Sequence, residues 1–265
     1  MRAGVYTCKL RLGCPQALEE GETATALDVS NTLWALGRLG SRPSEDDARK
    51  LLQLLVSRLD SCNDTSLAQS LWSLATLRLL HIEGAQVRRR CKPPAMSTDP
   101  SPSLSLSRAR TQALYESIAV LLETMDHLRQ DNTPRLLYHA YLMARHEGVA
   151  LPFPAAFLGA ASATWTFKLH NSGPNALHER VDRALAAFEV SHKLHDAAAD
   201  GVLRVHVAVP REGARPVALM LSGYSDYVHP CAGAQTERVE TGPVAMETAM
   251  LTADGWDVVR VGRVG

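Results

Sequence analysis

The chain has 265 residues, of which 46% are hydrophobic, and its 28 lysines and arginines balance its 28 aspartates and glutamates. This length and apolar content allow a sizeable buried core, whereas a net charge of zero lacks the basic excess that is usual in nucleic-acid-binding proteins. No apolar run reaches the ~18 residues that a membrane span requires, so we expect no membrane partner.

Two tryptophan-bearing segments near the N-terminus indicate an internal repeat. "NTLWALGRLG" begins at Asn31 and "QSLWSLATLR" at Gln69, which places Trp34 and Trp72 38 positions apart. The same register aligns four further apolar pairs: Val29 with Leu67, Leu33 with Leu71, Leu36 with Leu74, and Leu39 with Leu77. Apolar residues at this spacing form the stripe of an amphipathic helix. A match over several positions predicts that the two helices are copies of one unit.

A second amphipathic run, residues 45–59, lies between the two copies. It follows Ser44, which is a favourable N-cap, and its first turn is acidic. Its apolar face contains Ala48, Leu51, Leu52, Leu55 and Leu59. A helix pair cannot bury such a stripe alone, so the pattern predicts an α-solenoid of stacked helix pairs.

A third copy follows an insertion. Leu137, Tyr138, Ala140 and Met143 repeat the pattern of the second copy, after a helical pattern over residues 111–129. Residues 84–110 are rich in proline and serine and lack periodicity, which predicts a disordered insertion. We therefore predict a disordered N-terminal segment over residues 1–26 and helical repeats over 27–195, with Asn63 and Asn132 in the segments that cap the later copies.

The C-terminal third changes from helical to alternating periodicity. Residues 202–210 and 217–221 read as strands, residues 243–253 as a short helix, and a last strand opens at Gly255. These elements predict a compact α/β module over residues 201–265.

The repeat with its LWAL-type helix resembles the octotricopeptide and FAST-kinase-like repeats of organelle proteins. The segments "LRVHVAVP", "VALMLSGYSDY" and "TGPVAMETAMLTADGWDVVRVG" resemble the RAP domain, and "NALHERVDRAL" resembles the helix that precedes it. The RAP resemblance depends mainly on Gly223, Gly242, Leu251, Gly255 and Trp256. It implies a restriction-endonuclease-like module, residence in a mitochondrion or chloroplast, and a role in transcript stability, processing, translation or rRNA maturation through single-stranded mRNA or rRNA.

The chain departs from the RAP pattern where that domain carries carboxylates. The aligned positions hold His206, Met220 and Ser222, which form a poor ligand set for Mg²⁺. The chain also lacks the serine-hydrolase, Walker and zinc-protease motifs. We therefore expect no enzyme activity, no catalytic residue, no cofactor and no metal.

Cationic side chains on or beside the repeat helices are the candidate RNA contacts, because arginines neutralise phosphates. They are Arg38, Arg78, Arg88, Arg89, Arg90, Lys92, Arg135 and Arg145. The aromatic residues Trp34, Trp72 and Tyr138 are expected to be core residues, and Gly223, Gly255 and Trp256 to have structural roles. A protein-interaction scaffold without RNA contact is the alternative, which the neutral charge favours.

The remaining cysteines and histidines give no motif. The five cysteines are scattered without a C-x-x-C pair, which predicts free thiols in a reducing compartment. His192 and His195 are spaced for one helix face, but they lack the further ligands of a metal site.

Overall fold

A computed structural model describes residues 23–80, 114–120, 122, 132–171, 173–198, 201–228 and 239–262. The chain divides into two compact units, residues 1–158 and 159–265. Within the described ranges the chain is mainly helical with a four-stranded C-terminal mixed sheet, which confirms the coarse prediction of the fold. The predicted insertion, 84–110, and residues 1–22 of the predicted N-terminal segment lie outside the described ranges.

Local capping sets the ends of the first helices. Helix α2 (Ala26–Leu39) begins with a capping box, in which the Thr25 hydroxyl accepts from the Asp28 amide and the Asp28 carboxylate accepts from the Thr25 amide. It ends at Gly40, whose φ of 64° is in the left-handed region that favours glycine. Helix α3 (Glu45–Ser57) has Ser44 as the predicted N-cap, and the turn η1 (Leu59–Ser61) leads to α4 (Asp64–Thr76), which Asn63 caps.

Asn132 is the N-cap position of the predicted third copy, but it makes no side-chain capping bond. Helix α6 (Thr133–His146) follows Asn132, but the Asn132 backbone is already helical and its side chain accepts no capping hydrogen bond. Pro134 lies in the first turn instead, where its missing N–H is no loss. The unit also contains helical residues at 114–120 and 122, of which Leu114, Ile118 and Leu122 are buried. Helix α7 (Ala155–Asn171) follows α6 in the chain.

Small residues bring α2 and α4 close together. The Ser30 hydroxyl donates to the Ser66 carbonyl at 2.9 Å and accepts from the Ser70 hydroxyl at 3.2 Å, and all three residues are buried. At Gly37 an added Cβ would lie 3.1 Å from the Cα of Ser73. A glycine is therefore required here by the approach of the neighbouring helix.

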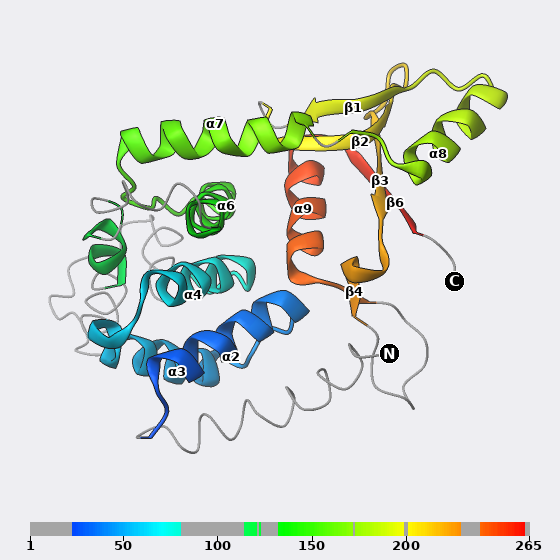
Figure 1. The fold of residues 1–265 in the computed structure, drawn as a ribbon. Coiled ribbons are helices and arrows are strands. Elements are labelled where there is room, and N and C mark those ends of the chain that lie inside the picture. Colours follow the sequence, from blue (N-terminus) through cyan, green and yellow to red (C-terminus); the bar gives the residue numbers. More distant parts are fainter. Residues whose placement is uncertain are drawn as a thin grey trace, which may run out of the picture. The chain divides into compact units, whose positions relative to one another are not determined.

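Helix α4 packs against both α2 and α6, and its contacts advance in the same chain direction along each pair. Figure 1 shows the three helices next to one another. Along α2 and α4, Ser30 meets Ser66 and Ser70, while four residues further on Trp34 meets Trp72. Along α4 and α6, Trp72 meets His139, Thr76 meets Met143 and Arg78 meets Glu147. Contact positions advance together in both pairs, so equivalent ends of the three helices lie at the same edge.

The second unit is built around a sheet with the strand order β1-β2-β3-β6. Strands β1 (Lys193–Ala198), β2 (Leu203–Val209) and β3 (Val217–Ser222) pair antiparallel, and β6 (Asp257–Gly262) pairs parallel to β3. Helix α9 (Gly242–Ala253) packs on β6, and α8 (Ala176–Ala187) contacts β2 (Figure 1). The turn η4 (Tyr224–Asp226) leads into a small ribbon of β4 (Tyr227–Val228) and β5 (Val239–Glu240).

The sequence patterns do not predict strand β1. The predicted repeat region extends to residue 195, whereas residues 193–195 open β1, so that His192 and His195 do not share a helix face. The segment "KLHDAA" has no alternating pattern, and its strand conformation depends on pairing with β2. The predicted β2, β3 and α9 are confirmed, and the last strand begins at Asp257, two residues after Gly255.

Candidate functional site

The described candidate arginines lie at both ends of the parallel helices. Arg38 and Arg145 are in the last turns of α2 and α6, and Arg78 follows α4 at the same edge. Arg78 pairs with Glu147 at 3.0 Å, while within the described ranges no carboxylate pairs with Arg38, Arg135 or Arg145, which are exposed. The four remaining candidates, Arg88, Arg89, Arg90 and Lys92, lie outside the described ranges.

Each of the three helices carries a polar side chain about one turn before the ring that it packs against its neighbour, and sequence reasoning did not assign these three to one site. Asn31 and Gln69 occupy equivalent positions of the predicted repeat, three residues before Trp34 and Trp72 respectively. On α6 the register of the contacts places Leu136 opposite Gln69, and the exposed polar side chain next to that position is Arg135, four residues before His139. Asn31 and Arg135 are exposed and Gln69 is half-buried. We call Asn31, Gln69 and Arg135 the polar row.

Rings that pack at a tilt lie about one turn further along each helix than the polar row. The ring centroids of Trp34 and Trp72 are 4.6 Å apart, and the Trp72 indole N–H donates to the His139 Nδ1 at 3.0 Å. Burial and the charge of Arg135 lower the pKa of His139 to about 4, so the ring is a neutral acceptor at neutral pH. Trp72 is buried and Trp34 is half-buried.

Tyr138 is buried as expected, but it does not take the place of Trp72 in the third copy. It stacks on Tyr141 within its own helix, and the next residue, His139, reaches Trp72 instead. An alignment of apolar positions identifies the buried face of α6. It does not show which of the neighbouring rings, Tyr138 or His139, reaches α4.

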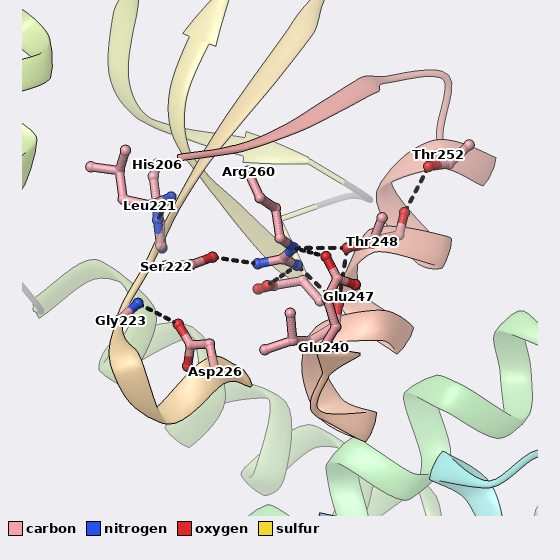
Figure 2. A network of polar contacts seen from close by, with 11 residues as sticks. His206, Leu221, Ser222, Gly223, Asp226, Glu240, Glu247, Thr248, Thr252 and Arg260 are labelled. Carbon is pink, nitrogen blue, oxygen red and sulfur yellow. Dashed lines mark hydrogen bonds and ion pairs between the residues drawn. The ribbon is translucent and has the colours of Figure 1, made fainter. Parts of the chain in front are cut away.

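Arg260 forms the centre of a polar network at the end of β3 and β6 (Figure 2). Its guanidinium Nε lies 3.2 Å from a Glu240 carboxylate oxygen, and its Nη2 lies 3.1 Å from a Glu247 oxygen. It also donates to the Thr248 hydroxyl, the Ser222 hydroxyl and the Val244 carbonyl. Only 10% of the Arg260 side chain is exposed, so this charge is held by protein groups.

Glu247 is the acid most affected by this environment. Burial raises the pKa of its carboxyl, while the charge and hydrogen bond of Arg260 lower it and the charges of Asp226 and Glu240 raise it further. The network therefore depends on Arg260 to keep Glu247 ionised beside two other acids. A guanidinium that already pairs with two carboxylates balances their charge as a bound cation would.

The three positions aligned with the RAP carboxylates lie around this network. The Ser222 side chain is buried and accepts from Arg260 at 3.3 Å, and Met220 is fully buried. The His206 Nδ1 accepts a hydrogen bond from the Leu221 amide at 2.8 Å (Figure 2). The ring nitrogen takes the place of a backbone carbonyl as acceptor, because the backbone pairing of β2 with β3 ends before Leu221. Sequence reasoning missed Arg260, Glu240 and Glu247, because nothing in the local pattern shows that these residues converge.

The remaining structural candidates differ in how strictly the fold requires them. Gly255 has a φ of 93° directly after α9, a conformation that favours glycine. Gly223 has an ordinary backbone, and its amide donates to the Asp226 carboxylate at 2.7 Å. Trp256 is half-buried, and its indole N–H donates to Asp254, so it is less enclosed than a core tryptophan.

His192 is used within the fold. Its Nε2 lies 2.8 Å from an Asp182 carboxylate oxygen and its Nδ1 lies 2.8 Å from the Val190 carbonyl. Two acceptors favour the doubly protonated ring, and both bonds raise the pKa of His192. In the described part of the chain, no three His, Cys, Asp or Glu side chains have an arrangement that could hold a metal ion.

Comparison with known proteins gives no relative from which a role can be transferred. No family model matches the chain, and no curated protein is similar to it. Among the helices of the described ranges, none is both long and apolar enough to cross a bilayer.

Proposed function

We propose that this chain is a non-catalytic RNA-binding protein of organelle gene expression. In this proposal α2, α4 and α6 are the first helices of three repeats of an α-solenoid, and a RAP-like module of restriction-endonuclease-like fold follows them. The observation that carries the proposal is the polar row on three parallel helices, with equivalent arginines at the helix ends. Modular helical repeats bind RNA by presenting a few side chains to each unstacked nucleotide.

The chemistry of the polar row suits base edges. The amides of Asn31 and Gln69 each combine donors and an acceptor, and the guanidinium of Arg135 can donate two parallel hydrogen bonds. Neighbouring packed helices lie about 8–10 Å apart, so the row offers contacts at regular intervals. Arg38 and Arg145, which are exposed at one edge of the helices, are available for phosphates.

The Arg260 network supports the non-catalytic part of the proposal. Metal-assisted phosphodiester cleavage needs acidic oxygens that converge on a cation. Glu240 and Glu247 are instead paired with Arg260, and the RAP-aligned positions supply an imidazole, a thioether and a hydroxyl. The module is therefore proposed to dock or to bind. The neutral net charge favours a protein partner as the second candidate.

Salt dependence of RNA affinity tests the proposal. The triple variant Arg38→Gln, Arg135→Gln, Arg145→Gln removes the exposed cations of the helices. Each phosphate contact on a single strand adds about −0.7 to the slope of log K against log salt, so losing three contacts should flatten the slope by about 2. Fluorescence anisotropy with labelled random-sequence single-stranded RNA measures this slope.

The matched control changes three exposed arginines of the second unit, Arg180, Arg183 and Arg215, to glutamine and alters the net charge equally. It should leave most of the slope intact. Asn31→Ala with Gln69→Ala should alter base preference with little change in slope, because base contacts specify and phosphate contacts position. Equal effects of both triple variants, or no RNA binding at all, would contradict the proposal and favour the scaffold.

A further inference from the structure

Three histidines from three different elements of the second unit lie against one another. His178 of α8 stacks on His195 of β1 with ring centroids 4.8 Å apart and planes inclined by 17°. His178 also meets the edge of His206 of β2, with centroids 5.1 Å apart. Because α8 is a separate element from both strands, these rings are contacts between the helix and the sheet. We call His178, His195 and His206 the histidine cluster.

The hydrogen bonding of the histidine cluster is incomplete. The Nε2 of His178 and both ring nitrogens of His195 are buried and have no partner among the described residues. The His178 Nδ1 is occupied by the capping box with Asn175, and the His206 Nδ1 accepts from the Leu221 amide. His195 also has a φ of 55°, an unusual conformation for a residue other than glycine or asparagine.

The charges that face the histidine cluster are positive. Arg204 of β2 acts on all three rings, and Arg260 of β6 acts on His206. The carboxylate of Asp196, next to His195 on β1, is paired with Lys193 at 2.6 Å. The acids nearest Arg260, Glu240 and Glu247, are already bound to it. Within the described ranges, a proton added to the cluster would therefore lack a compensating acceptor.

We propose that the histidine cluster is a proton-sensitive latch that holds α8 on the sheet while its three rings are neutral and releases α8 when a ring becomes charged. The inference goes beyond RNA binding and does not depend on it. Stacked neutral imidazoles pack as apolar groups, whereas an imidazolium beside a second ring and Arg204 is a buried unpaired charge.

The titration behaviour agrees with this geometry. Burial and the positive charge of Arg204 lower the pKa values of His178 and His195, and burial, His178 and Arg204 lower that of His206 to about 4. A lowered histidine pKa means that the folded state binds fewer protons than the unfolded chain. Stability is therefore complete above the ordinary histidine pKa of about 6.5 and is lost as the pH falls toward 4.

His192 has the opposite pH dependence in its contact with α8. Its bond to Asp182 of α8 strengthens when the ring is protonated, and its pKa is raised. The stability that this contact contributes is lost as the pH rises through the raised pKa of His192. The two devices differ in sign, so a variant of the cluster can be distinguished from a general effect of acid.

Hydrogen exchange of the full chain tests the latch. Amide protection of residues 176–187, corrected for intrinsic exchange, should fall on the order of tenfold or more from pH 7.5 to pH 5.0. The reason is that the histidine rings bind protons more readily when α8 is released from the sheet, so a lower pH favours the released state. In His195→Asn this fall should be clearly smaller, because one of the three titrating rings is gone and asparagine tolerates the left-handed backbone. His146→Asn, at an exposed position of the other unit, should behave as the unmodified chain.

Two outcomes would overturn the latch: equal α8 protection at both pH values in the unmodified chain, or an undiminished fall in His195→Asn. If the variant does not fold, NMR titration of the unmodified chain decides. The imidazole signals of His178, His195 and His206 should then titrate together below the ordinary histidine pKa, with the α8 amides shifting at the same midpoint. Independent titration near pH 6.5 with unchanged α8 amides would refute the latch.

Discussion

Gly37→Leu should destabilise the helical unit by about 3 kcal/mol, among the largest effects of a single substitution in this chain. The first added carbon already meets the Ser73 Cα at 3.1 Å and the Ser73 side chain at 3.2 Å. Because one of these atoms is backbone, the larger side chain can be accommodated only if α2 moves away from α4. Such movement would break the Ser30–Ser66 hydrogen bond and the packing of Trp34 on Trp72.

Urea unfolding followed by circular dichroism and by tryptophan fluorescence measures this loss. Gly159→Leu is the matched control, since no atom lies within 4 Å of a Cβ added there, and it should be neutral or slightly stabilising. Gly37→Ala combined with Ser73→Gly should recover part of the loss seen in Gly37→Ala alone. A Gly37→Leu protein as stable as its Gly159→Leu control would show that α2 and α4 are not in close contact.

Arg260→Met should cost the second unit about 3–4 kcal/mol at neutral pH. The change keeps much of the side-chain volume but removes the cation shared by Glu240 and Glu247, and it strands hydrogen-bond acceptors on Ser222 and Val244. Breaking one side of a largely buried ion pair leaves uncompensated charge, which is far costlier than the loss of a surface pair.

The pH dependence of that loss gives a second readout. Without Arg260, burial and neighbouring acids would raise the pKa of Glu247 further above its value in the unfolded chain. A carboxyl with a raised pKa gains stability as the pH falls, so the difference between Arg260→Met and the unmodified chain should shrink from pH 7.5 to pH 5.0. Thermal unfolding at both pH values measures it. Arg180→Met, at an exposed site, should change stability by less than about 0.5 kcal/mol at either pH, and a similar small effect for Arg260→Met would contradict the network.

Sequence periodicity predicted the helices of the first unit well because burial follows the pattern directly. Val29, Leu33, Leu51, Leu55 and Leu71 occupy the predicted apolar stripes and are fully buried. The small residues that set the helix spacing, Ser30 and Gly37, were not predicted as packing residues. Their role depends on the distance to a neighbouring helix, which composition and periodicity do not encode.

The second unit shows where local patterns lose information. Strands β2 and β3 alternate or are apolar and are predictable, whereas β1 is polar and forms through pairing with β2. The sequence predicts Arg260 only as part of a strand, and its partners Glu240 and Glu247 belong to β5 and α9. Long-range convergence of this kind requires the fold.

For the candidate RNA interface, the sequence supplied the arginines and the repeat register, and the structure supplied the parallel helix direction. The proposed row of Asn31, Gln69 and Arg135 is an inference from the predicted register and the helix direction, and the sequence predicts Arg135 only as a phosphate contact. The aromatic equivalence predicted between Trp72 and Tyr138 failed by one residue, because His139 is the ring that α6 turns toward α4.

Ultraviolet crosslinking of the full chain to single-stranded RNA, followed by mass spectrometry of the crosslinked peptides, tests the RNA-binding proposal most directly. The proposal predicts crosslinks in peptides that cover α2, α4 and α6, near Asn31, Gln69 and Arg135, and their loss in the triple arginine variant. Crosslinks confined to residues 159–265, or none above those of a denatured control, would contradict it.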